Sequence, residues 1–300
     1  MDIINKLKKS LRISKRTLNI VIILSTLTAA VYYFYKHHTL LTDLKKISPF
    51  VAVEVFFLYI LMLAVLILIY QATMKLVNIK ISFKENGLIN AYSLFMNFFI
   101  PGQTGPAFRA YYMKKNYSLK YLNYTLSTIF YYLIYGLLSV IFILVGSQPI
   151  YLSLPVILIF ILIAVLAIRI YLKKKKQVRL ELSIKSIAFL TLATFCQVVL
   201  QSVIYFIEIH SIASGIHFNQ VITYTGVANL ALFAALTPGA IGIREGLLIL
   251  TEKLNHVTSN TIVLANVIDR SVYIIFLLIL GILIAGLKIK QKLGVSEQVT

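Results

Sequence analysis

Cysteine and charged residues are scarce in this chain of 300 residues. Only 13% of its residues are charged, whereas about a quarter are charged in a typical soluble domain. The single cysteine, Cys196, excludes a disulfide within the chain, and no Cys/His spacing suits a metal. Cys196 lies inside an apolar run, where we expect a small buried residue. These scarcities argue against a soluble enzyme or a metal-binding module.

Acidic residues are the scarcest charges. The chain has 10 Asp and Glu against 29 Lys and Arg, a net charge of +19. The basic residues gather at the ends of apolar runs, which is typical of membrane proteins rather than of nucleic-acid partners. With 59% hydrophobic residues and a mean hydropathy of +0.88, the composition predicts an all-α polytopic membrane protein.

Six apolar runs reach the roughly 20 residues needed to span a bilayer. They lie at about 17–36, 49–70, 121–146, 150–172, 184–209 and 262–286. The first follows a basic segment, 1–16, and resembles a retained signal anchor. We predict one transmembrane domain over 17–287, followed by a cytoplasmic tail, 288–300.

Two further apolar stretches stop early, each at a P-G-x-x-G motif. Proline cannot donate to the preceding helical turn, and glycine tolerates a positive φ, so both motifs should break a helix. The residues after each break again favour helix. The motifs therefore predict two re-entrant hairpins, at about 86–116 and about 218–255. Their turn residues are Pro101, Gly102 and Gly105 in the first and Pro238, Gly239 and Gly242 in the second.

The basic residues give the hairpins a direction. With the N-terminus in the cytoplasm, 22 of the 29 Lys and Arg fall inside, four fall outside, and Arg109, Arg244 and Arg270 lie at membrane depth. Counting either break as a full span would swap the later loops and remove this bias. The positive-inside rule therefore favours hairpins entering from opposite faces, with both termini cytoplasmic.

The two motifs also mark an internal repeat. Pro101 and Pro238 are 137 positions apart. The order of a span, a hairpin and a second span occurs at about 49–146 and again at about 184–286. Because one further span lies between the two copies, the second copy has the opposite orientation in the membrane. Inverted repeats with broken helices are typical of secondary transporters.

The breaks place helix N-termini, with their free N–H groups, near the protein centre. Such N-termini favour anions, and a guanidinium can bind phosphate through two parallel bonds. Arg109 and Arg244 follow the two breaks closely, and Gln103 and Thr104 could line a cavity there. The alternative is purely structural pairing of these arginines. For Arg270 we favour pairing with Glu245 or Asp269.

Other polar residues give weaker signals. Glu54 and Glu208 could each bind a proton or a cation, and Glu208 is expected near the outer interface. Gln197 and Gln201 share a helix face, which favours interhelix hydrogen bonds. The tyrosines, including Tyr131 and Tyr132, are expected mostly in interfacial belts. We find no catalytic set and no nucleotide loop, and we predict neither enzyme activity nor a cofactor.

At "PGQTGPAFRAYYM", "LTPGAIGIREGLLIL" and "DRSVYIIFLLILGIL" the sequence resembles the lysylphosphatidylglycerol synthase transmembrane region family. The resemblance covers about 15–290 and implies a membrane domain that moves lipids between leaflets, without the aminoacyl transferase domain of the fused members. The matching residues include Pro101, Gly102, Gly105, Arg109, Pro238, Gly239, Gly242, Arg244, Glu245 and Arg270. The first motif departs from the family pattern, which has an acidic residue soon after its second glycine.

The sequence thus predicts a flippase-like lipid transporter in the cell membrane that works by alternating access. Candidate cargoes are plain or aminoacylated phosphatidylglycerol, polyprenyl phosphates and glycolipids. The alternatives are an ion-coupled carrier of a small anion, an accessory subunit of a lipid-modifying enzyme and an intramembrane lipid transferase. The hypothesis of an accessory subunit predicts that Arg109 and Arg244 are fully paired and that no cavity exists. A homodimer is compatible with this class, but no residue pattern demonstrates it.

Overall fold

The structure is a computed structural model. It describes residues 48–99, 104–147, 180–181, 183–234, 243–250 and 256–286 and the single residues 162, 240 and 252. In these ranges it contains eight α-helices, one 3-10 helix and no strand. The predicted segments 1–16, 17–36, 150–172 (except Leu162) and 288–300 lie outside the described residues, as do Pro101, Gly102, Gln103, Pro238, Gly239 and Gly242.

Among the described residues, four helices are long and apolar enough to cross a membrane: α4 (Pro49–Lys75), α7 (Tyr121–Gly146), α9 (Ile184–Ile212) and α13 (Ser259–Gly286). At 1.5 Å per residue, the 26 residues of α7 extend about 39 Å, more than the roughly 30 Å of a hydrocarbon core. Large apolar side chains such as Phe57, Leu192 and Ile282 point outward from these helices. Four of the six predicted spans are therefore confirmed as membrane-length helices.

Local sequence signals explain where these helices begin. Ser48 precedes α4, and its hydroxyl accepts a hydrogen bond from the Phe50 N–H at 3.3 Å. Pro49 occupies the first helical turn, where its missing N–H is not needed. Ser183 caps α9 in the same way, accepting from the Ser186 N–H at 3.2 Å. The serines satisfy donors that the helix itself leaves unpaired.

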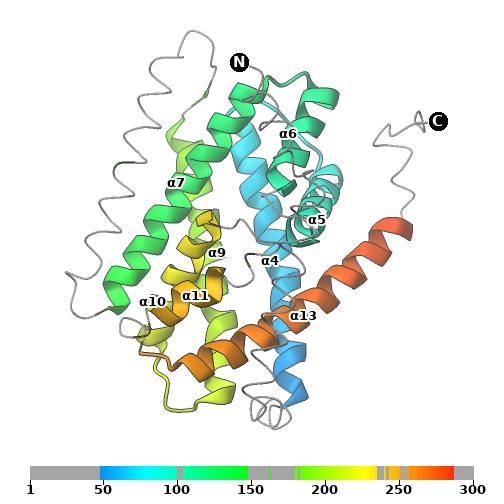
Figure 1. Ribbon diagram of the computed structural model, residues 1–300. Helices are drawn as coiled ribbons and strands as arrows, with labels where there is room; N and C mark the ends of the chain where they lie inside the picture. The colour runs from blue at the N-terminus through cyan, green and yellow to red at the C-terminus, as the bar shows by residue number, and fades with distance from the viewer. Residues whose placement is uncertain are drawn as a thin grey trace, which may run out of the picture.

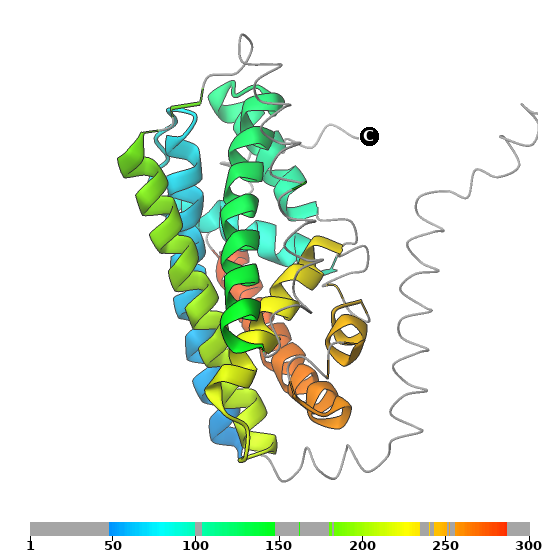
Figure 2. The same ribbon diagram turned by 90° about the vertical axis from the view of Figure 1, so that its left-hand side faces the viewer.

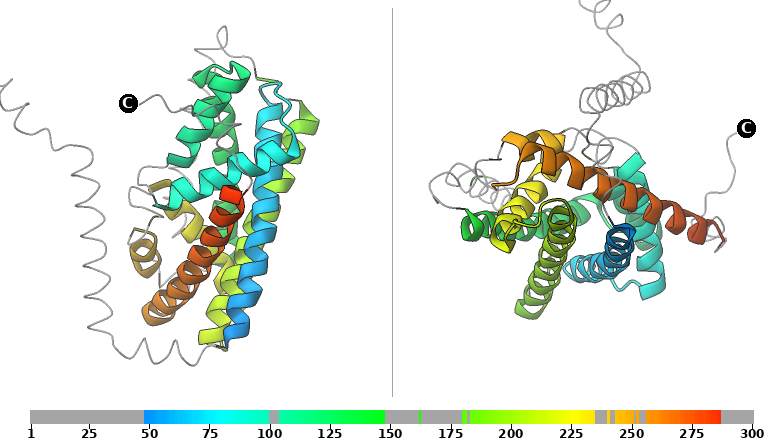
Figure 3. Two further views of the ribbon diagram at one scale, coloured as in Figure 1. Left: turned by 90° about the vertical axis from the view of Figure 1, so that its right-hand side faces the viewer. Right: turned by 90° about the horizontal axis from the view of Figure 1, so that it is seen from below.

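The long helices form the frame of the molecule. Helices α4 and α9 run antiparallel and side by side, as Figure 1 and Figure 2 show. Helix α13 crosses the frame obliquely and packs on both, and the view from below shows this crossing (Figure 3). The largest apolar core fills the space between α4, α9, α13 and the shorter α10, and includes Val55, Ile204 and Leu277.

The remaining α-helices are too short to span a bilayer. They are α5 (Phe83–Phe99), α6 (Thr104–Tyr117), α10 (Phe218–Ala231) and α11 (Ile243–Leu250), with the 3-10 helix η3 (Leu232–Ala234) after α10. Helices α5 and α6 pack together near the upper end of the frame, whereas α10 starts at the lower end and stops midway (Figure 1). Helix α5 ends at Phe99 and α6 begins at Thr104, and η3 ends at Ala234 before α11 begins at Ile243. Most of each P-G-x-x-G motif lies outside the described residues, so the predicted turns stay predictions.

The α5–α6 pair is held by close backbone packing and by one carboxylate. A Cβ added to Gly105 would lie 2.5 Å from the Ser93 carbonyl oxygen, so only glycine allows this approach. Glu85 accepts hydrogen bonds from the hydroxyls of Tyr112 at 2.6 Å and Tyr117 at 2.7 Å. Burial and the bond to Glu85 raise the pKa of Tyr117 to about 12. Tyr117 therefore keeps its proton, and its bond, at neutral pH.

Candidate functional site

A cavity of about 450 Å³ lies at the centre of the molecule, where the short helices end. Its walls come from α4, α5, α7, α9, α11 and α13. Phe98 lies near the end of α5 on one side, and Leu232, Phe233 and Ala240 follow α10 on the other. The cavity therefore lies between the end of α5 and the end of α10.

Tyrosines dominate the polar surface of this cavity. The lining includes Tyr59, Tyr131, Tyr132, Tyr135, Tyr205 and Tyr273. Tyr131 donates a hydrogen bond to Gln197 Oε1 at 3.0 Å, which confirms the predicted interhelix role of Gln197, and Gln201 lines the same wall. The expectation that Tyr131 and Tyr132 belong to an interfacial belt was wrong. Hydropathy does not distinguish a tyrosine that faces a headgroup layer from one that faces an internal cavity.

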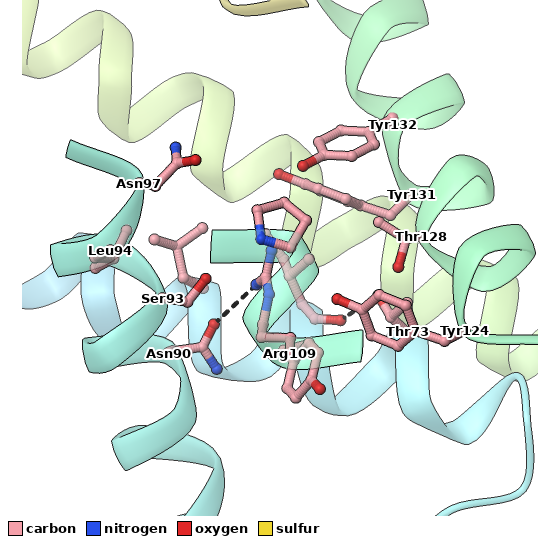
Figure 4. A pocket seen from close by; sticks show the side chains of 14 residues that line it. Thr73, Asn90, Ser93, Leu94, Asn97, Arg109, Tyr124, Thr128, Tyr131 and Tyr132 are labelled. Atoms are coloured by element: carbon pink, nitrogen blue, oxygen red, sulfur yellow. Dashed lines mark hydrogen bonds between the residues drawn. The ribbon is translucent and has the colours of Figure 1, made fainter. Parts of the chain in front are cut away.

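Arg109 lies in a smaller adjoining cavity of about 100 Å³ that shares Leu66, Leu94, Asn97, Tyr131 and Tyr132 with the larger one. Its Nη1 donates to Asn90 Oδ1 at 3.3 Å, and its guanidinium lies 5.1 Å from the centre of the Tyr70 ring. Figure 4 shows Arg109 between Asn90 and the side chains of α7. Within the described residues, no carboxylate pairs with Arg109.

Asn90 is itself held in place. Its amide donates to the Asn86 carbonyl oxygen at 2.9 Å and to Asn86 Oδ1 at 2.7 Å, and Asn86 donates to the Ile67 carbonyl at 2.9 Å. Because the Asn90 amide hydrogens are used on α5, its oxygen is left to face Arg109. A buried chain of amides therefore orients the guanidinium without neutralising its charge.

Arg244 has the opposite environment. Its Nη2 lies 2.8 Å from Asp269 Oδ2, and both side chains are buried. The guanidinium also lies 5.2 Å from the centre of the Tyr205 ring, and the Tyr59 hydroxyl donates to the second oxygen of Asp269. Arg244 and Asp269 both line the central cavity. The positive charge of Arg244 is thus largely compensated by Asp269.

Arg270 pairs with Glu245, with Nη2 at 3.5 Å from Oε1. Glu245 is one of the two partners that the sequence predicted for Arg270. In sequence Glu245 follows Arg244 and Asp269 precedes Arg270, but adjacent helical residues point in different directions. Each arginine therefore pairs with an acid on the other helix, which joins α11 to α13 through two ion pairs.

The remaining residues that the sequence singled out are partly where we expected them and partly not. Thr104 begins α6, and its hydroxyl donates to the Met96 carbonyl at 2.9 Å, which ties α6 to α5. Gln103 lies outside the described residues. Two expectations were wrong: Cys196 is exposed on the outer side of α9, and Glu208 is buried rather than interfacial. Apolar sequence around Cys196 could not separate a lipid-facing side from a packed one.

In the described part of the chain, four membrane-length helices and a cavity with a partly polar lining define a multi-pass integral membrane protein. Residues 16–281 match the lysylphosphatidylglycerol synthase TM region family, and the chain belongs to that family. Membership connects the protein with membrane lipid metabolism or translocation. No curated protein matches the chain.

Proposed function

We propose that this protein is a lipid translocase that moves an anionic or aminoacylated phospholipid, or a polyprenyl phosphate, between leaflets. The observation that carries the proposal is Arg109, an oriented guanidinium that faces a cavity without a carboxylate partner in the described part of the chain. An ionisable group at membrane depth is costly, and a phosphate would compensate it. The protein acts as a transporter rather than as an enzyme.

The proposed topology follows the sequence repeat. Helices α5–α6 and α10–α11 form two re-entrant hairpins that enter from opposite faces, and the runs at 17–36 and 150–172 complete six spans, with both termini in the cytoplasm. The lengths of the short helices and the opposite starting ends of α5 and α10 support this arrangement. Non-helical backbone at such depth requires a protein or wet surrounding, which the cavity provides.

In this mechanism the headgroup enters the cavity while its acyl or prenyl chains stay in the lipid. Arg109 and the start of α6, with Gln103 and Thr104, bind the phosphate on one side. Arg244 and Arg270 line the opposite wall, and Glu245 takes part through its ion pair with Arg270. One repeat moves against the other to alternate access. The cavity favours a translocase over an accessory subunit, and so does Arg109, whose charge no carboxylate among the described residues neutralises.

Leaflet exchange in liposomes tests the proposal. Purified protein is reconstituted with fluorescent phosphatidylglycerol or polyprenyl phosphate, and exchange is compared with that of Arg109→Ala and Arg109→Lys. Removing a charged hydrogen-bond partner is worth about 1.5–3 kcal/mol, so Arg109→Ala should slow exchange about 10- to 100-fold, and lysine should restore part of it. Lys114→Ala, which removes an exposed cation from the same helix, is the matched control. Unchanged exchange in Arg109→Ala would refute the assignment.

The topology has its own test. In a Cys196→Ser background, single cysteines replace Ser118 and Gly215, which are both exposed. A membrane-impermeant thiol reagent should label position 118 from the cytoplasmic side only and position 215 from the outer side only. Labelling of both positions from one side would contradict hairpins that enter from opposite faces.

A further inference from the structure

Glu208, near the end of α9, is a carboxyl group that the proposed mechanism leaves unused. Its side chain is completely buried, and in the described part of the chain neither Oε1 nor Oε2 has a hydrogen-bond partner. An ionised carboxylate without a partner is very costly in such a place, whereas a neutral carboxyl is tolerated. The geometry therefore points to a carboxyl that holds a proton at neutral pH.

The groups around Glu208 come from every neighbouring helix. They are Tyr59 on α4, Tyr205 on α9, Tyr224 on α10, Arg244 on α11, and Asp269 and Arg270 on α13. His210 is exposed and stacks on Phe206, with 5.2 Å between ring centres. Two guanidinium groups in this set disfavour a metal cation near Glu208, while a proton leaves the carboxyl neutral.

Glu208 is not among the residues that line the cavity. Three lining residues, Tyr59, Tyr205 and Asp269, interact with it electrostatically, and the Tyr59 hydroxyl donates to Asp269. Asp269 is thus the link between this carboxyl and the arginine that faces the cavity, because it pairs with Arg244 at 2.8 Å. A change in that pairing alters the field at Glu208.

We propose that Glu208 is a proton-binding site that couples proton movement to lipid exchange at the cavity; this rests on the proposed function. An anionic headgroup takes Arg244 away from Asp269. The Glu208 side chain then turns to contact Asp269 and passes its proton to that carboxylate, and the Glu208 carboxylate takes up another proton from water at the nearby end of α9. One proton therefore enters with each headgroup, and the protein needs no other coupling ion.

The protonation of Glu208 can be tested by infrared spectroscopy, which does not depend on lipid transport. Infrared difference spectra of the reconstituted protein at neutral pH should contain a protonated-carboxyl C=O band that disappears in Glu208→Gln. Glutamine has the shape of a neutral glutamic acid, so the variant should keep its melting temperature. Glu54→Gln, which changes an exposed acid on α4, should leave the band in place. A spectrum in which Glu208→Gln removes no such band would overturn the site.

Coupling is measured by leaflet exchange of fluorescent phosphatidylglycerol with and without a transmembrane pH difference. The wild type should distribute the lipid according to the direction of the pH difference, and Glu208→Gln should exchange lipid without regard to it. Exchange that ignores the pH difference in the wild type, or that follows a sodium gradient at constant pH, would overturn the coupling but leave the translocase standing. If the wild type moves no lipid, the proposed function fails together with the coupling, and the infrared band still decides whether Glu208 binds a proton.

Discussion

Arg244 on α11 and Asp269 on α13 form a buried ion pair, with 2.8 Å between Nη2 and Oδ2. The pair faces the central cavity from the second half of the chain, whereas Arg109 faces the adjoining cavity from the first half, with no acid paired to it among the described residues. The two halves of the proposed repeat therefore differ in charge compensation. The Arg244 charge is therefore compensated within the fold, whereas Arg109 meets only amide and aromatic groups among the described residues.

Asp269→Asn should strongly destabilise the protein. Removing one partner of a buried ion pair leaves an uncompensated charge, which typically costs about 3–5 kcal/mol. Thermal unfolding in detergent micelles measures the loss. The control is Arg270→Gln, which breaks a longer, partly exposed pair at 3.5 Å and should cost no more than about 1 kcal/mol. Equal losses in the two variants would show that burial does not set the strength of these pairs.

Arg109→Gln should separate stability from activity. Glutamine can still donate to Asn90, and the contact with Tyr70 is worth only about 0.5–1 kcal/mol. We therefore expect the free energy of unfolding to change by less than about 1.5 kcal/mol while lipid exchange is lost. A large fall in melting temperature would instead mean that Arg109 is a structural residue.

Periodicity and charge placement predicted much of the fold because membrane crossing is a local property of the chain. The run 121–146 became α7 with the same bounds, and described helices end at Phe99 and Ala234, beside the stretches for which the sequence predicts breaks. It was harder to predict which residues of a span are packed inside the protein and which face outward. Cys196 and Ala193 lie three residues apart in one apolar run, yet Cys196 faces outward and Ala193 is packed.

The site was predicted less completely, because its geometry depends on contacts between distant segments. The sequence indicated Arg109, Arg244 and Arg270, since charges at membrane depth are conspicuous. It did not indicate that Arg244 would pair with Asp269, 25 positions away, or that tyrosines would line the cavity. The i, i+4 spacing of Gln197 and Gln201 was the one available signal for a polar face on α9.

Leucine substitutions test which side of α9 meets lipid. Cys196→Leu should change stability by less than about 0.5 kcal/mol, because an outward side chain has room. Ala193→Leu, three residues earlier, should cost about 1–3 kcal/mol because Ala193 packs against Ile69 and Ala72 of α4. Thermal unfolding in detergent micelles measures the stability of both variants. A destabilising Cys196→Leu would show that another element covers this side of α9.

Ala240→Gly should stabilise the protein slightly. Ala240 has a φ of 58°, and a left-handed conformation costs an L-residue about 1–2 kcal/mol. The greater entropy of glycine in the unfolded chain offsets about 0.5–1 kcal/mol of the gain. Asn78→Gly, at a φ of 57° in an exposed link, is the control and should gain less, because asparagine tolerates this region. Loss of stability in Ala240→Gly would mean that the methyl group is needed for packing.

Gly105→Ala should loosen the α5–α6 pair. The added Cβ would lie 2.5 Å from the Ser93 carbonyl oxygen and 2.6 Å from Ser93 Oγ, so the helices must separate. Overpacking of this kind costs about 1–3 kcal/mol, and it would also displace Arg109 on the following turn, so lipid exchange should fall.

The matched control is Gly246→Ala on α11, where an added Cβ meets nothing within 4 Å among the described residues. Alanine is the better helix former there, by about 1 kcal/mol, so this variant should melt at a higher temperature. Unfolding of both variants in the same detergent compares close packing with helix propensity directly. If Gly105→Ala were as stable as Gly246→Ala, the two helices of the first pair would not approach as closely as the structure places them.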